Sequence, residues 1–242
     1  MKVAHISDIH LTENGRIIWG ADTMFHFNKL ISVLANHYLD AIIISGDLSD
    51  DGSEWSYDYL DSAFSKLGIP TYCCMGNHDS FENFSRMKYI KQTDCFCLEG
   101  WKFILLNSVI KDESEPGKNK SRGFLNSDCL LTLRNELKNN MPTAVFFHHP
   151  PIEPGGWLNR RLLENRVAFN ELIKGTSVRL VAYGHIHYAT KSLIDNIHYT
   201  SAPGIGFGFD KDLPKFQIAD GTEGFNIITF ENNTADIETV LI

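Results

Sequence analysis

The chain has 242 residues, of which 43% are hydrophobic and 21% are charged, and its formal net charge is −8. A hydrophobic fraction of this size supports a buried core and excludes a largely disordered chain. The acidic balance argues against non-specific binding of a nucleic-acid polymer through a basic surface. The longest apolar runs, such as residues 41–44 and 103–106, are far shorter than the ~20 residues of a membrane-spanning helix.

The N-terminus and the cysteines both favour a cytoplasmic protein. Met1-Lys2 leads directly into the first predicted strand, so we expect no signal peptide. The chain has five cysteines, and an odd number without a secretory signal indicates reduced thiols with structural roles rather than a disulfide framework.

The first third of the chain alternates predicted strands with predicted helices. Residues 2–7, 41–44 and 69–75 are apolar runs typical of buried strands. Residues 23–37 and 53–66 carry apolar side chains at helical spacing. This alternation predicts parallel strands joined by helices.

The rest of the chain adds helices, strands and three long loops. Predicted helices span residues 84–91, 126–139 and 165–174, and predicted strands span 95–99, 101–107, 144–147, 178–183, 191–194, 198–201, 225–230 and 236–242. Predicted loops span 111–123, 152–163 and 202–221. No repeat or linker divides the sequence. We therefore expect one α/β domain covering residues 1–242, in which late hairpins add antiparallel strands to a largely parallel sheet.

Five apolar runs are each followed by a cluster of polar side chains. In such sheets, ligands bind beyond the carboxyl ends of the strands, and all five clusters occupy that position. Each motif alone is more often an ordinary turn, but their joint occurrence favours a common site. The clusters are Asp8-Ile9-His10, Gly46-Asp47, Gly76-Asn77-His78-Asp79, His148-His149 and Gly184-His185-Ile186-His187.

The side chains in these clusters are suited to metal binding. Carboxylates, imidazoles and an amide without a thiolate favour Mn, Fe, Zn or Co over a structural zinc site. The candidate ligands are too many for one tetrahedral ion but fit two ions that share a bridging carboxylate. Two ions ~3.5–4 Å apart can activate a water and stabilise the entering and leaving oxygens of a phosphoryl transfer. The candidates are Asp8, His10, Asp47, Asn77, His148, His185 and His187.

Taken together, the five motifs resemble those of the calcineurin-like metallophosphoesterase superfamily. The resemblance implies a four-layer α/β/β/α sandwich with mixed sheets and a dimetal site at the carboxyl ends of the strands. It implies one ion held by Asp8, His10 and His187, a second held by Asn77, His148 and His185, and Asp47 bridging both. His148 is preferred to His149 because the family's ligand stands two residues before the proline, here Pro150.

The resemblance also implies a mechanism and substrate contacts. A metal-bridging hydroxide would attack phosphorus in line, His78 would contact the phosphate and protonate the leaving oxygen, and Asp79 would orient His78. Apart from the resemblance, Asn77 and His149 are expected to contribute to substrate binding. Arg160, with its neighbours Trp157 and Arg161, is a candidate contact for a base or phosphate, and a merely solvated loop is the alternative.

Within the superfamily, the chain is most similar to the class III cyclic nucleotide phosphodiesterases and the related glycerophosphodiesterases. The segment His148-His149-Pro150-Pro151, the short acidic loop after Asp47 and the simple β tail carry this likeness. The Ser/Thr phosphatases fit less well, because they carry Gly-Asn-His-Glu where this chain has Asp79.

The expected substrate is therefore a small phosphodiester, either a 3′,5′-cyclic nucleotide or a glycerophosphodiester. No nucleic-acid polymer and no membrane are expected as partners, and a homodimer is one assembly that similar phosphodiesterases adopt. Two alternatives stay open: a phosphomonoesterase acting on a small metabolite or phosphoprotein, and a non-catalytic metal-binding scaffold.

Overall fold

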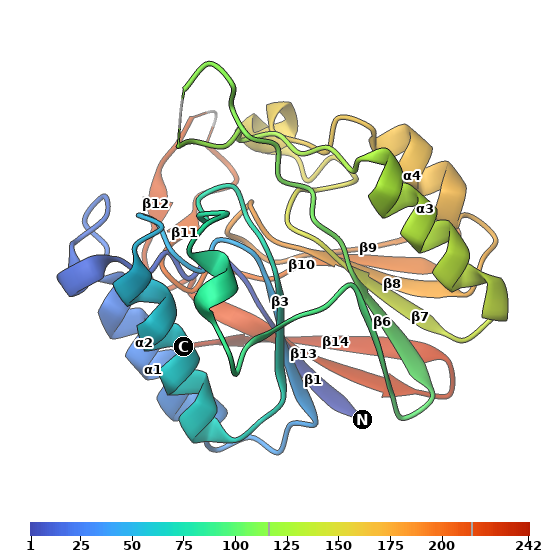
Figure 1. The fold of residues 1–242 in the computed structure, drawn as a ribbon, viewed down its shortest axis with the longest axis horizontal. Helices are drawn as coiled ribbons and strands as arrows, with labels where there is room; N and C mark the ends of the chain where they lie inside the picture. Colours follow the sequence, from blue (N-terminus) through green and yellow to red (C-terminus); the bar gives the residue numbers. More distant parts are fainter. Residues whose placement is uncertain (116, 214) are drawn as a thin grey trace.

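Two mixed β-sheets pack face to face and carry helices on both outer sides (Figure 1). The computed structural model describes residues 1–115, 117–213 and 215–242. Helices α1 and α2 lie against one sheet, and α3 and α4 lie against the other (Figure 1). The predicted four-layer α/β/β/α sandwich is confirmed.

The first sheet has the strand order β14-β13-β1-β2-β3-β4. Strands β1 to β4 run parallel, and β13 joins the other edge of β1 in antiparallel orientation. The strand bounds are β1 Lys2–Ile6, β2 Ala41–Ser45, β3 Thr71–Cys74, β4 Lys91–Gln92, β13 Gly224–Glu231 and β14 Thr234–Leu241.

The second sheet has the strand order β5-β6-β7-β8-β10-β9. Strands β6, β7, β8 and β10 run parallel, and the edge strands β5 and β9 are antiparallel to their neighbours. The strand bounds are β5 Cys95–Leu98, β6 Trp101–Leu105, β7 Thr143–Phe146, β8 Val178–Tyr183, β9 Thr190–Ile194 and β10 Ile197–Ser201.

Helices α1, α2 and α3 begin where the sequence provides capping side chains. Asp22, Ser53 and Asn126 each accept a hydrogen bond from a backbone N–H in the first turn of α1, α2 and α3. Gly68 ends α2 in the left-handed conformation. The helix bounds are α1 Thr23–Leu34, α2 Glu54–Leu67, α3 Ser127–Glu136 and α4 Arg166–Ile173, with short 3₁₀ turns at Glu13–Gly15, Phe84–Arg86, Leu137–Asn139 and Gly156–Arg160.

The core has three layers, one between the sheets and one beneath each helix pair. The central layer contains side chains such as Val3, Ile43, Phe103, Phe146 and Leu180, which come from both sheets. Strand β2 is buried along its whole length, because the central layer covers one face and α1 and α2 cover the other.

The prediction of a helix at residues 84–91 is wrong. Only Phe84–Arg86 forms a short 3₁₀ turn. The carboxylate of Asp61 on α2 accepts hydrogen bonds from the backbone N–H groups of Lys88, Tyr89 and Ile90, at 2.8–3.1 Å. This side chain from another element occupies the backbone donors that a helix would need.

Two of the predicted loops contain short ordered pairings. A bridge joins Lys111 to Asn119 in the first loop. The predicted 202–221 loop contains a two-stranded ribbon, β11 Gly208–Phe209 and β12 Ile218–Ala219. Residue 116 of the first loop and residue 214 of the second lie outside the described residues. The described helices all lack the combined length and apolar character that crossing a bilayer requires.

Candidate metal centre

The five polar clusters converge where β1, β2, β3, β7 and β8 end. The backbone ties neighbouring clusters together: Asp8 N–H donates to Gly46 O at 3.1 Å, and His10 N–H donates to Asp47 O at 3.0 Å. Gly184 N–H donates to His148 O at 3.0 Å across the second sheet. Clusters far apart in sequence thus share one edge of the sandwich, as predicted.

Several candidate ligands lie in a backbone conformation that side chains rarely adopt. Their φ angles range from +49° to +74°, in the left-handed region where non-glycine residues are uncommon. Strained backbone of this kind concentrates at functional sites. Here it turns the chain sharply after a strand and exposes the side chain beyond the strand end. The residues are Asp8, His10, Asp47, His185 and His187.

One group of candidate ligands consists of Asp8, His10 and His187. The Nε2 atom of His187 lies 3.3 Å from Oδ1 of Asp8 and 3.2 Å from Nε2 of His10. The opposite ring nitrogens have other partners: His187 Nδ1 lies 2.8 Å from Phe207 O, and His10 Nδ1 lies 3.1 Å from Asp50 Oδ1. Such partners fix a metal-ligating imidazole in orientation and tautomer.

The second group consists of Asp47, His148 and His185, with Asn77 beside it. The Nε2 atom of His148 lies 3.2 Å from Asp47 Oδ2, from His185 Nδ1 and from Asn77 Oδ1. The Nδ1 atom of His148 lies 2.8 Å from Ser45 O, so Nε2 faces the group. Asp47 Oδ2 is also 3.6 Å from His10 Nε2, which places this carboxylate between the two groups.

These side chains fit divalent cations. In His10 and His187, Nδ1 faces an acceptor oxygen and therefore carries the ring proton. Each Nε2 atom then has a free lone pair, and the two Nε2 atoms lie 3.2 Å apart. The carboxylates of Asp8 and Asp47 add negative charge beside these nitrogens. Divalent cations would bind the lone pairs and the carboxylates together.

Burial keeps three candidate imidazoles in the neutral form that metals bind. It lowers the pKa of His187 to about 3, and it also lowers the pKa of His10 and His185. Burial would lower the pKa of His148 as well, but the nearby Asp47 carboxylate outweighs burial and raises it to about 9. Asp47 and His148 thus share a proton that a cation would replace.

His78 lies beside the two groups and is oriented by Asp50. Its Nδ1 atom lies 3.1 Å from Asp50 Oδ1. Burial acts to lower the pKa of His78, but the carboxylates of Asp47 and Asp50 outweigh it and raise this pKa to about 9. The imidazole is therefore a proton donor at neutral pH.

The prediction that Asp79 orients His78 is wrong. The Asp79 carboxylate instead accepts hydrogen bonds from the backbone N–H groups of Gly76, Leu48 and Ser49 and from the Tyr57 hydroxyl. It ties the loop after β2 to the loop after β3. The sequence analysis missed Asp50, although its place three residues after Asp47 in the acidic loop was an available signal.

A cavity of about 140 Å³ opens over the candidate ligands. It is lined by His10, Asp47, Asn77, His78, His185 and His187 on the polar side and by Trp19, Ser121, Trp157, Leu158, Arg161, Phe207, Phe209 and Phe216 elsewhere.

Two predicted substrate contacts, His149 and Arg160, are not among the residues that line this cavity. His149 is fully buried, and its Nδ1 lies 2.8 Å from the Ser108 hydroxyl, so its side chain packs beneath the site. The guanidinium of Arg160 lies 5.9 Å from the centroid of the Trp157 ring, while Trp157 and Arg161, candidates from the same loop, line the cavity.

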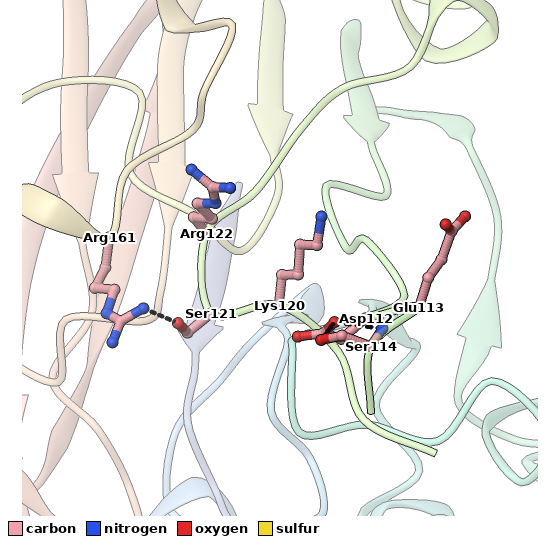
Figure 2. A pocket seen from close by; sticks show the side chains of 7 residues that line it. All are labelled: Asp112, Glu113, Ser114, Lys120, Ser121, Arg122 and Arg161. Atoms are coloured by element: carbon pink, nitrogen blue, oxygen red, sulfur yellow. Dashed lines mark hydrogen bonds between the residues drawn. The ribbon is translucent and has the colours of Figure 1, made fainter. Parts of the chain in front are cut away.

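A second cavity of about 400 Å³ adjoins the first and shares Ser121 and Arg161 with it. Figure 2 shows Arg161 donating a hydrogen bond to Ser121, with Lys120 and Arg122 beyond it. Arg122 is paired with Glu164 at 2.7 Å. The loops around residues 111–123 and 152–163 therefore meet beside the candidate metal centre.

Comparisons with known proteins agree with this geometry. The family model of the calcineurin-like phosphoesterases matches residues 1–189. A protein of Nostoc sp. named a 3′,5′-cyclic-nucleotide phosphodiesterase is 31% identical over 238 residues, which cover 94% of this chain and 87% of that protein. A Mycobacterium tuberculosis protein named a cAMP/cGMP dual specificity phosphodiesterase is 29% identical over 244 residues, covering 93% of this chain and 74% of that protein.

Among solved structures, a dimetal phosphatase from Danio rerio has the same fold. It superimposes with a TM-score of 0.72 at 12% identity, and the match covers 98% of this chain and 95% of that chain. Together with the family match over residues 1–189, the converging ligand groups lead to one conclusion. The chain belongs to the calcineurin-like phosphoesterase family and is a metal-dependent phosphoester hydrolase.

Proposed function

We propose that this protein hydrolyses a small phosphodiester, a 3′,5′-cyclic nucleotide or a glycerophosphodiester, with the help of two divalent cations. The observation that carries this proposal is the position of Asp47 Oδ2, 3.2 Å from Nε2 of His148 and 3.6 Å from Nε2 of His10. One carboxylate between two imidazole groups is the arrangement that two neighbouring ions require.

The ligand groups divide between the two ions. Asp8, His10 and His187 would hold one ion, Asn77, His148 and His185 would hold the other, and Asp47 would bridge them. When bound, the ions would neutralise charge on the phosphate oxygens and lower the pKa of a water molecule. Since only two carboxylates belong to this set, the loaded site keeps a net positive charge and attracts a phosphate anion. Mn, Fe, Zn and Co all suit these ligands.

His78 is the proposed proton donor to the leaving oxygen. Its side chain lines the cavity and is 35% exposed, whereas the proposed ligands His10 and His148 are buried. In the metal-free protein the carboxylates of Asp47 and Asp50 raise its pKa to about 9, and Asp50 stays its partner when Asp47 binds the cations. Asp50 holds Nδ1, so that Nε2 is free to donate to the alkoxide as the phosphorus–oxygen bond breaks.

The diester preference is supported by the names of the relatives. The Nostoc and Mycobacterium tuberculosis proteins are both named as cyclic nucleotide phosphodiesterases, and their matches extend over nearly this whole chain. The proposed unit is the entire chain 1–242, because strands after residue 189 complete both sheets.

The test compares an aryl phosphodiester with the matching aryl phosphomonoester on metal-stripped protein reloaded with Mn. We expect faster hydrolysis of the diester, measured as kcat/KM. A preference for the monoester would contradict the phosphodiesterase proposal and favour a phosphomonoesterase. If neither ester were hydrolysed while the metals bound, the chain would be a scaffold.

A further inference from the structure

A wall of aromatic rings extends from the candidate metal ligands to the surface. Phe207 and Phe209 stack on the ring of His187, with centroid distances of 4.5 and 4.3 Å and interplanar angles of 22° and 26°. Both phenylalanines are buried. They form the inner layer of this wall and help to position the His187 ring.

The outer layer consists of Trp19 and Phe216, whose rings remain open to solvent. Trp19 is 58% exposed and Phe216 is 40% exposed. Their ring centroids lie 4.8 Å apart at an angle of 70°, and Trp19 packs on Phe207 at 5.2 Å. Both line the same cavity as His78. Two partly exposed aromatic rings therefore stand edge to face beside the proposed reaction site.

The backbone at Trp19 indicates that this exposed position is not accidental. Trp19 has a φ of +47° and Gly20 a φ of +91°, in a tight turn closed by two hydrogen bonds between Ile18 and Ala21, at 3.0 and 2.8 Å. Such turns favour asparagine or glycine at the first central position. A bulky residue in the left-handed region is an outlier. Packing explains little here, because most of the Trp19 side chain is exposed.

We infer that Trp19 and Phe216 form a stacking platform for a planar aromatic part of the substrate, a nucleobase, and thereby select a nucleotide over a glycerophosphodiester. This inference rests on the proposed function and names the substrate class for the same site. The base lies against these two exposed rings while the phosphate lies over the ligand groups, and Arg161 lines the same cavity. Base–aromatic stacking tolerates any base, because every base has a π-face.

The kinetic test uses two diesters, 3′,5′-cyclic AMP and glycerophosphoethanolamine, on the Mn-loaded protein. The variants are Trp19→Ala, Phe216→Ala and the conservative Trp19→Phe. Tyr38→Ala is the control, because Tyr38 is 98% exposed and lies at the opposite, amino end of β2.

We expect Trp19→Ala and Phe216→Ala each to raise KM for cyclic AMP by roughly 5- to 100-fold. The kcat should stay within about threefold, and the kinetics on the glycerophosphodiester should not change. Trp19→Phe should keep most of the affinity, and Tyr38→Ala should behave as wild type. An equal change on both diesters, or none on cyclic AMP, would overturn the inference.

A binding measurement separates this inference from the proposed function. In the wild type, AMP should quench tryptophan fluorescence and ribose 5-phosphate should not. Because Trp157 also lines the cavity, the quenching should become clearly weaker in Trp19→Phe and stay unchanged in Tyr38→Ala. If the wild type hydrolysed neither diester, the proposed function alone would fail, and this measurement would still decide the inference. Equal quenching in wild type and Trp19→Phe would overturn it.

Discussion

The Oδ1 atom of Asp50 lies 3.1 Å from Nδ1 of His78, the proposed proton donor. The same oxygen lies 3.1 Å from Nδ1 of His10, a proposed metal ligand. Asp50 thus links the two proposed functions of the site, metal binding and proton transfer. Residues that orient ligands in this way typically change metal affinity or activity by 10- to 100-fold when they are replaced.

We expect Asp50→Asn to lower kcat by about 10- to 100-fold at saturating Mn, because His78 loses its orienting carboxylate. His78→Ala should lower kcat by about 10²- to 10⁴-fold and keep both ions. Steady-state kinetics and metal analysis on the same preparations would check both results. The exposed Asp58→Asn variant is the control.

The double variant of Asp50 and His78 tests whether the two residues act together. At saturating Mn, where the contact of Asp50 with His10 does not limit metal occupancy, the double variant should be little slower than His78→Ala. A loss equal to the product of the single losses would contradict this coupling. Loss of the metals in His78→Ala would contradict the role given to His78.

We expect Asp79→Ala to lower the stability of the fold, because Asp79 has a structural role and does not orient His78. Its carboxylate accepts hydrogen bonds from three backbone N–H groups and from Tyr57. Removing it leaves buried donors without acceptors, so we expect a loss of about 3 kcal/mol or more in the free energy of unfolding. Urea unfolding of the metal-free protein would measure it, with Tyr57→Phe as a milder reference at about 1 kcal/mol. A change below roughly 0.5 kcal/mol, which is about the error of such measurements, would contradict this structural role.

Gly76→Ala should weaken metal binding through steric overlap. A Cβ atom at Gly76 would overlap with the backbone nitrogen and Oδ1 of Asp47. Moving Asp47 separates the two ligand groups, so we expect Mn affinity to fall by at least about tenfold and stability by about 1–3 kcal/mol. Gly100→Ala is the matched control, because its Cβ would meet nothing within 4 Å and only the left-handed φ of +78° is strained. Wild-type Mn affinity in Gly76→Ala, measured by calorimetry, would contradict the steric argument.

His5 should make stability fall in mild acid. Burial lowers its pKa to about 3 in the folded protein, against about 6.5 in an unfolded chain. Between these values the unfolded state binds the additional proton, so stability decreases as pH falls below about 6.5. From pH 7.5 to 5.5 this group should contribute a loss of roughly 1.4 kcal/mol.

Urea unfolding of the wild type and of His5→Gln at these two pH values would measure the contribution. The difference between the two pH values should shrink in His5→Gln. It should not change in His198→Gln, which replaces a partly exposed histidine on β10. An unchanged pH difference in His5→Gln would contradict the assignment.

The sequence predicted that the five clusters lie together, because each cluster follows a strand whose apolar pattern is clear. Parallel strands place their carboxyl ends at one edge, so Asp8, Asp47 and Asn77 could be assigned to one site before their distances were known. His185 and His187 follow the same rule in the second sheet.

Contacts between loops could not be predicted in this way. Asp50 reaches His78 only because the loops after β2 and β3 are tied together, and the sequence analysis gave that orienting task to the adjacent Asp79. Likewise, the helix expected at residues 84–91 does not form, because the side chain of Asp61 on α2 accepts hydrogen bonds from its backbone N–H groups. No sequence pattern pointed to Trp19, because its exposure and its left-handed φ arise only in the folded turn.

The most direct test of the central claim measures metal content and cyclic AMP hydrolysis together, in wild type and Asp47→Ala. The account predicts two Mn ions per wild-type chain and turnover that depends on them, because Asp47 lies between the two ligand groups. It predicts that Asp47→Ala loses both the metals and the turnover. Full turnover by a wild-type chain holding one ion or none, or an active Asp47→Ala variant, would contradict the two-metal account.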